Sequence, residues 1–236
     1  MGATLLDHAM ISDGDHVLVG LSGGKDSMIL LESLVERRAV VPFEFQITAA
    51  QIEASGIGYK IDREKLSGFC DQLNVPLHYK IIEPDLEKDK SKSACFVCSW
   101  HRRKELFSMV EELNCNKLAL GHHRNDAVET LLLNMIYHGS ISSLPYSLEM
   151  FEGKVKLIRP LMDLNENMLE EYAALNNLVK VEKSCPHENS TQRQSIRQLL
   201  REIEELHGSG AYNMFKSMGK IHTDYLPGSP TKESKT

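Results

Sequence analysis

The chain has 236 residues, 42% of them hydrophobic and 25% charged, which suits one α/β domain with a real core. It contains no apolar run long enough for a transmembrane helix, and residues 1–21 lack the pattern of a signal peptide, so we expect a cytoplasmic protein that does not enter a membrane. The net charge of −6 gives no general basic footprint for nucleic acid, although a local basic face is compatible with it.

Short apolar segments alternate with amphipathic ones along the chain. We predict buried strands at residues 16–20, 43–52, 77–82, 117–121 and 155–158. We predict helices at residues 26–37, 63–73, 98–113, 122–137, 166–175 and 191–206. The polar stretch 83–94 is expected to be a mobile loop and the tail 227–236 to be disordered.

This alternation predicts an α/β fold, with a doubly wound, mostly parallel sheet of about five strands and helices on both faces. We expect residues 1–226 to form a single domain whose C-terminal part, about 164–222, is helical. In such sheets, ligands bind beyond the carboxyl ends of the strands.

A glycine-rich loop, Ser22-Gly23-Gly24-Lys25-Asp26-Ser27, follows the first predicted strand. Adjacent glycines let main-chain amides approach an anion, and the start of a helix adds the positive end of its dipole. The serines can bond phosphate oxygens, Lys25 can neutralise them, and Asp26 can help to hold Mg²⁺. The spacing fits neither the P-loop of NTPases nor the dinucleotide-binding fingerprint. It is similar to the PP-loop of ATP pyrophosphatases, and the alternative is a plain glycine-rich turn.

The chain contains five cysteines, an odd number that does not suggest a secreted disulfide framework. Cys95 and Cys98 form a Cys-x-x-Cys motif where a helix begins near three cations, a setting that favours thiolates. Together with the distant Cys185 they could hold an iron–sulfur cluster that leaves one iron without a protein ligand. Alternatively, the pair forms a redox disulfide or binds zinc with a histidine. Cys70 and Cys115 are expected to be small buried residues.

A third group of polar residues follows the fourth predicted strand, in the segment Gly121-His122-His123-Arg124-Asn125-Asp126. The histidines can contact a nucleotide phosphate or base, and Asp126 could orient a substrate or metal. The alternative is that one histidine caps the helix and Asp126 complements its dipole. Arg159, at the end of the fifth strand, is either an ATP contact or part of a surface ion pair.

Basic residues suggest contacts with RNA at two places. Arg102 and Arg103 follow the Cys-x-x-Cys motif, and Arg193 begins a set that recurs every four residues with Arg197 and Arg201. That spacing places the set on one stripe of a helix, although neighbouring glutamates also fit a solvated face. The single tryptophan, beside the cysteines, could stack on a base or be buried.

Taken in order, these motifs resemble the tRNA 2-thiocytidine synthetase family from about residue 11 to about residue 215. The resemblance implies a PP-loop fold, ATP with Mg²⁺, and a [4Fe-4S] cluster held by Cys95, Cys98 and Cys185. It also implies tRNA as substrate and sulfur supplied by a cysteine desulfurase. The C2 oxygen of a cytidine in the anticodon loop would attack the α-phosphate, and sulfur carried on the cluster would then displace AMP.

We therefore predict catalytic roles for Lys25 and Asp126. The predicted ATP-binding residues are Ser22, Gly23, Gly24, Lys25, Asp26, Ser27, Ala50, Gly121, His122 and Arg159, and the predicted RNA-binding residues are Arg102, Arg103 and Arg193. Asn125 stands where family members carry aspartate, and the chain begins almost at the first strand instead of with a basic helix. A homodimer would add tRNA-binding surface. The competing hypotheses are a PP-loop ligase acting on a small molecule and a non-catalytic, cluster-bearing ATP sensor.

Overall fold

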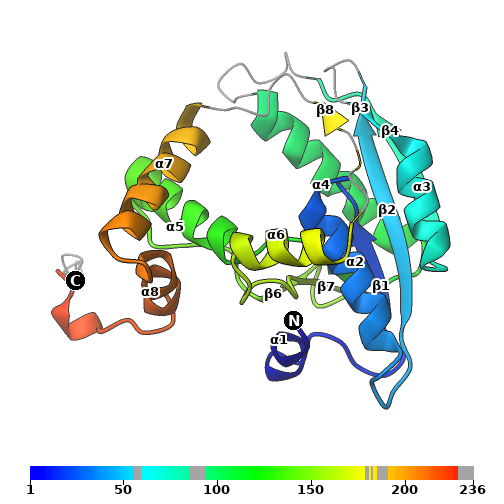
Figure 1. Cartoon of the computed structure of the whole chain (residues 1–236), viewed down its shortest axis with the longest axis horizontal. Helices are drawn as coiled ribbons and strands as arrows, with labels where there is room; N and C mark the ends of the chain where they lie inside the picture. Colours follow the sequence, from blue (N-terminus) through cyan, green and yellow to red (C-terminus); the bar gives the residue numbers. More distant parts are fainter. Residues whose placement is uncertain (56–59, 86–93, 179–180, 182, 185–190, 228–236) are drawn as a thin grey trace, which may run out of the picture.

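The computed structural model describes residues 1–55, 60–85, 94–178, 181, 183–184 and 191–227, without the side chains of residues 60, 95, 183, 184 and 191. Its main feature is a six-stranded sheet in the order β4-β2-β1-β5-β7-β6 (Figure 1). The parallel strands are β1 (His16–Gly20), β2 (Gln46–Ala54), β4 (Leu77–Ile82), β5 (Lys117–Ala119) and β7 (Val155–Ile158). The sixth, β6 (Ser147–Met150), runs antiparallel to β7.

Two hydrophobic clusters show that both faces of this sheet are covered. Val17 and Val19 belong to one cluster and Leu18 to the other, because successive side chains of a strand point to opposite faces. The first cluster includes residues of α2 (Lys25–Arg38), α3 (Arg63–Gln72) and α6 (Glu166–Leu175), and the second includes residues of α4 (Ala94–Glu112). The predicted doubly wound α/β fold is therefore confirmed.

A third cluster forms away from the sheet, where α5 (Arg124–His138) packs against α7 (Thr191–Leu206) and α8 (Gly210–Ser217). Val128 and Leu132 of α5 meet Ile196 and Leu200 of α7 there. Figure 1 shows α7 and α8 on the far side of α5 from the strands. No helix in the described ranges is long and apolar enough to cross a membrane.

Several elements were absent from the sequence prediction. The sheet has six strands instead of five because β6 is a short edge strand with little apolar alternation. Three further elements were not predicted. They are the short helix α1 (Gly2–Asp7) near the N-terminus, and α8 and the 3₁₀ turn η1 (Thr223–Tyr225) near the C-terminus. A two-stranded ladder joins β3 (Lys60–Ile61) to β8 (Lys183–Ser184). Most of the predicted loop 83–94 and of the predicted tail 227–236 lies outside the described residues.

The order of the strands places a switch point between β1 and β5. From β1 the chain proceeds to β2 and β4 on one side, and later to β5 and β7 on the other. The segments that follow Gly20 and Ala119 therefore leave the same edge of the sheet side by side. This is where ligands bind in open α/β sheets.

Candidate functional site

The glycine-rich loop connects β1 to α2 at this edge. Gly23 has a φ of +73°, and a Cβ atom on it would clash with Ile61 and approach Val181, so only glycine is compatible with this position. Gly24 is the N-cap of α2. The backbone N–H groups of the first turn of α2 therefore point toward the loop, where they can donate hydrogen bonds to an anion.

The two serines of the loop hold its shape from inside. The Oγ atoms of Ser22 and Ser27 lie 3.2 Å apart, and the Ser27 hydroxyl donates to the carbonyl of Gly24 at 2.9 Å. The backbone N–H of Ser22 donates to Ser27 Oγ at 3.2 Å. The hydroxyls that the sequence assigned to phosphate contacts thus also fix the backbone around the phosphate position.

Lys25 stands at the mouth of the loop between two carboxylates. Its Nζ lies 3.2 Å from Asp26 Oδ1 and 3.2 Å from Glu166 Oε1. Burial lowers the pKa of Lys25, but Asp26 and Glu166 together outweigh burial and raise it above its usual value. Lys25 is therefore a permanent cation where ATP phosphates would arrive. Glu166 comes from the start of α6 and was not anticipated from the sequence.

The turn after β5 packs directly against the glycine-rich loop. A Cβ atom on Gly121 would lie 2.9 Å from the Ser27 nitrogen and 3.0 Å from the Asp26 carbonyl oxygen. His123 is the N-cap of α5, and its backbone N–H donates to Asp126 Oδ2 at 2.9 Å. Asp126 therefore stabilises the start of the helix, in agreement with the structural alternative that a histidine caps α5 and Asp126 complements its dipole.

His122 lies among arginines from three elements. Burial lowers its pKa to about 4, against an opposing effect of Asp126, and Arg159, Arg103 and Arg193 lower it further. Two of the predicted RNA-binding residues, from α4 and α7, therefore come close to a predicted ATP-binding residue. The neutral imidazole and its basic surroundings form a place for an anion at the edge of the sheet.

Arg159 is buried, with only 5% of its surface exposed, so it is not the surface ion pair considered from the sequence. Its Nη1 donates to the carbonyl of Pro145 at 2.6 Å, and its Nε has no partner among the described residues. Burial and Arg103 lower its pKa to about 10. Ala50 pairs with Gly20 in the sheet, and its carbonyl accepts the N–H of Leu21, so it lies beneath the loop.

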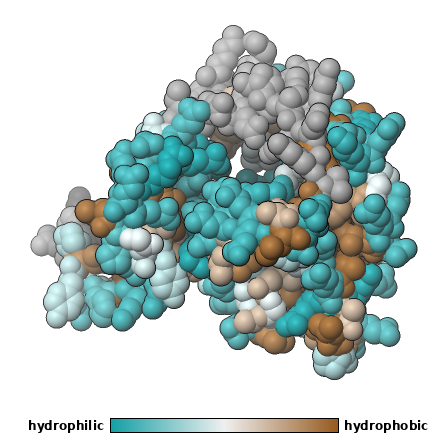
Figure 2. All heavy atoms as spheres, in the orientation of Figure 1, coloured by the Kyte–Doolittle hydropathy of each residue, from teal (hydrophilic) through white to brown (hydrophobic). Residues whose placement is uncertain are grey.

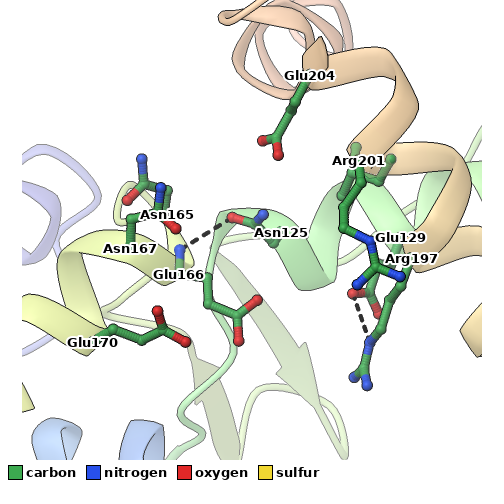
Figure 3. A pocket seen from close by; sticks show the side chains of 10 residues that line it. Asn125, Glu129, Asn165, Glu166, Asn167, Glu170, Arg197, Arg201 and Glu204 are labelled. Carbon is green, nitrogen blue, oxygen red and sulfur yellow. Dashed lines mark hydrogen bonds and ion pairs between the residues drawn. The ribbon is translucent and has the colours of Figure 1, made fainter.

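The basic stripe of α7 is exposed, in agreement with the expected solvated face, but its central residue also reaches α5. Arg197 Nε lies 3.0 Å from Glu129 Oε1, and Glu129 is buried. Both line a cavity of about 210 Å³ between α5, α6 and α7, together with Asn125, Glu166 and Arg201 (Figure 3). This surface is hydrophilic, and the molecule is hollowed above α6 (Figure 2). Glu129 carried no motif that could have identified it.

The predicted cluster ligands are only partly described. Cys98 is buried near the start of α4, and position 95 lies one turn earlier on the same face. The side chain of Cys95 and the whole of Cys185 lie outside the described residues, within which no metal-binding group of three side chains is found. Ser184, which precedes Cys185, pairs with Lys60 beside Ile61, the residue in contact with Gly23.

The remaining residues assigned from the sequence take the following positions. Cys70 and Cys115 are buried, as expected, and burial raises their pKa values to about 12 and about 11. Trp100 is 49% exposed, which excludes the second of its two alternatives, burial, and the Nζ of Lys104 lies 5.7 Å from the centroid of its ring. Arg102 and Arg103 follow it on α4, with Arg103 exposed.

The chain matches the family model of the PP-loop domain over residues 3–203. The tRNA-cytidine(32) 2-sulfurtransferase of Polynucleobacter asymbioticus is 35% identical to it over 96% of this chain and 76% of that protein. The tRNA-cytidine(32) 2-sulfurtransferase of Chromohalobacter salexigens is 36% identical over 96% of this chain and 81% of that protein. The solved structure of the U34-tRNA thiolase NcsA from Methanococcus maripaludis, with its [4Fe-4S] cluster, superimposes with a TM-score of 0.76. That match has 23% identity and covers 94% of this chain and 76% of the other, so it concerns the fold.

Proposed function

This chain belongs to the PP-loop family, in the group of the tRNA-cytidine(32) 2-sulfurtransferases, and we propose that it uses ATP to replace the C2 oxygen of a cytidine in tRNA with sulfur. The name of these relatives places their cytidine at position 32, and we assign the same position to the substrate of this chain. Their shared substrate favours tRNA over the small-molecule ligase that the sequence left open.

The observation that carries the proposal is the packing of Gly121 against Ser27. It joins the anion-binding start of α2 to the segment that holds His122, at the carboxyl edge of the sheet. One substrate can therefore be held against ATP at this point. A glycine-rich turn that binds no ligand would not require the segment of Gly121 to pack this closely against Ser27.

The first chemical step is adenylation. The C2 oxygen of the cytosine attacks the α-phosphorus, the bond between the α- and β-phosphates breaks, and pyrophosphate leaves. Ser22, Gly23, Gly24 and Ser27 would bind the leaving phosphates, and Lys25 would neutralise the charge that develops on them. Asp26 would share Mg²⁺ with those phosphates.

The other predicted residues take supporting roles in the proposal. Ala50 would lie beneath the bound nucleotide. Gly121, His122 and Arg159 would line one side of the nucleotide site. Asp126 holds the start of α5 in place and from there orients the substrate. Arg102, Arg103 and Arg193 would bind the RNA backbone, in which phosphate contacts supply position and affinity.

In the second step, sulfur adds to C2 and AMP leaves with the original oxygen. Cys95, Cys98 and Cys185 would hold the [4Fe-4S] cluster, and three thiolates are a donor set that suits a cluster with one open iron. When bound, the cluster would supply sulfur to the activated base. Adenylation makes the oxygen a good leaving group, and this is the reason that ATP is consumed.

The remaining features of the proposal concern the setting of the enzyme. We assign it to the cytoplasm, with a cysteine desulfurase as the source of sulfur and a second copy of the chain as a partner that extends the tRNA surface. Residues 1–226 would act as a single domain, with the helices within about 164–222 as its tRNA-facing part.

The test is nucleoside mass spectrometry of tRNA from cells that lack the gene. 2-Thiocytidine should be absent and should return with the wild-type gene but not with Lys25→Gln. With purified protein, release of pyrophosphate from ATP should depend on added tRNA. Turnover triggered by small molecules alone, or 2-thiocytidine that persists in the deletion strain, would contradict the proposal.

A further inference from the structure

The cavity between α5, α6 and α7 adjoins the proposed ATP site. Glu166 lines it and also contacts Lys25, so the cavity and the phosphate loop share this residue. Asn125 Oδ1 accepts a hydrogen bond from the backbone N–H of Glu166 at 3.2 Å, which holds the starts of α5 and α6 together. A molecule in this cavity would therefore lie next to the reacting end of ATP.

One buried polar atom of a residue that lines the cavity has no hydrogen-bond partner among the described residues. Glu129 is 6% exposed, and its Oε1 accepts from Arg197, but its Oε2 has no hydrogen-bond partner among the described residues. Burial raises the pKa of Glu129, and the nearby Arg197 only partly offsets this effect. A buried acceptor without a donor costs free energy, so the site favours a ligand that brings an N–H group.

Cytosine and uracil differ at C4 and at the adjacent N3, which is an acceptor in cytosine and an N–H donor in uracil. Cytosine carries an amine, a hydrogen-bond donor, at the position where uracil carries an acceptor oxygen. A carboxylate that faces C4 is an acceptor when ionised, so at that position it suits the amine of cytosine and repels the oxygen of uracil. The relatives of this chain act on cytidine, whereas the structural neighbour in the same fold acts on uridine, so the fold alone does not decide the base.

The geometry of the cavity also suits the reaction. Figure 3 shows Glu129 and Glu166 on opposite sides, with Asn125 between them. In cytosine, the amine and the C2 oxygen flank the ring nitrogen N3 from opposite sides. A base that places its amine against Glu129 therefore directs its C2 oxygen toward Glu166 and Lys25, where ATP would react with it. Enzymes that modify bases commonly read the flipped base on this edge.

We propose that this cavity receives the base of the target cytidine and that Glu129 Oε2 accepts the hydrogen bond from its exocyclic amine, so that Glu129 selects cytidine over uridine. The proposal rests on the tRNA-sulfurtransferase function above. Arg197 would hold the carboxylate in position through Oε1, and Arg201 would cover the base from α7.

The experiment compares tRNA transcripts that carry C or U at the target position. The wild-type enzyme should prefer C by about 100-fold in kcat/KM for pyrophosphate release, because a site built to bond an N–H rejects the analogue without it. Glu129→Gln should reduce this ratio by about 10-fold or more and improve use of U, because an amide can rotate to donate to the uracil oxygen. Glu202→Gln, which makes the same change on the exposed side of α7 and outside the cavity, should keep the wild-type ratio.

A second measurement needs no variant and so does not depend on folding of the mutant. With the wild-type enzyme, a transcript that carries pyrimidin-2-one, which lacks the amine, should lose about the same factor as U. An unchanged C-to-U ratio in folded Glu129→Gln, or full activity on pyrimidin-2-one, would overturn the proposal. A higher Mg²⁺ requirement with an unchanged ratio would also overturn it and would point to a cation site. If the wild type shows no tRNA-dependent turnover, the function proposed above fails instead.

Discussion

Gly121 and Ser27 belong to different crossovers of the sheet, yet a Cβ atom on Gly121 would lie 2.9 Å from the Ser27 nitrogen. The neighbouring atoms are backbone, so they cannot move aside as the tip of a flexible side chain could. Any larger residue at position 121 must displace the start of α2. The glycine therefore sets the geometry of the phosphate loop from outside the loop.

Gly121→Ala is expected to weaken ATP binding severely and to lower the free energy of unfolding by about 1–3 kcal/mol, as overpacking does. Isothermal titration calorimetry with ATP and thermal unfolding measure the two effects. The matched control is Gly68→Ala in α3, where a Cβ atom would meet nothing within 4 Å. That control should stabilise the protein by about 0.5–1 kcal/mol, because it removes a glycine from a helix. Normal ATP affinity in Gly121→Ala would show that the contact is not needed.

Without bound phosphate, Lys25 forms ion pairs with Asp26 and Glu166. Glu166 does not belong to the loop, so we expect the loop to form without its carboxylate. Glu166→Gln should increase ATP affinity by about two- to fivefold, because it removes a negative charge that competes for Lys25. Lys25→Gln should reduce tRNA-dependent pyrophosphate release by about 100-fold or more without unfolding the protein. If Glu166→Gln weakens binding of ATP with Mg²⁺ instead, Glu166 is a metal ligand.

The sequence was sufficient to predict the fold and to propose the candidate site residues that lie together within one segment. The glycine-rich loop could be assigned because its glycines, serines and lysine are adjacent and follow an apolar strand. The position of Gly121 at the same edge followed from the rule that parallel strands end together. The antiparallel strand β6 was missed because its half-exposed residues carry no strong alternation.

Contacts between distant segments could not be predicted in this way. Glu166 lies 141 residues after Lys25, and Glu129 lies 68 residues before Arg197. Neither glutamate differs in local sequence from one on a solvated helix, so no pattern marks them. Their roles come from the packing of α6 against α2 and of α7 against α5, which depends on the whole fold.

His122 should make the protein less stable in acid. Its pKa in the folded protein is about 4, below the ordinary value of 6.5. Above pH 6.5 the imidazole is neutral in both the folded and the unfolded chain, so the full stability of the fold is present there. Part of that stability is lost as the pH falls from 6.5 toward 4, because the unfolded chain then binds a proton that the folded chain excludes. The loss should be about 1.4 kcal/mol per pH unit near pH 5. Urea unfolding of His122→Gln at pH 7, 6 and 5 should show a flatter dependence by that amount, and an equal slope would contradict the assignment.

Cys98 and Cys115 are both buried, but only Cys98 is expected to bind iron. Cys98→Ser, purified without oxygen, should lose the broad absorbance near about 400 nm that clusters give, while it still binds ATP. Cys115→Ala should keep the absorbance, because Cys115 packs in the core beneath α4 and burial raises its pKa to about 11. A cluster that survives in Cys98→Ser would remove Cys98 from the ligand set.

Arg103 is one of the three residues that we propose to bind RNA. Besides burial, Arg103 contributes to the lowered pKa values of both His122 and Arg159, so its charge reaches the carboxyl edge of the sheet although its side chain is exposed. Arg103→Gln should weaken tRNA binding and reduce the slope of log affinity against log salt concentration by about 1, because one phosphate contact is lost. ATP affinity should change little.

The control is Lys154→Gln. Lys154 is exposed and directly precedes β7, so it lies at the opposite, amino edge of that strand. Filter-binding titrations at several salt concentrations should give this variant the wild-type slope. If both variants lose the same affinity, binding follows the overall charge of the protein. If neither does, the RNA does not pass over α4 and the basic residues beside His122 serve ATP alone.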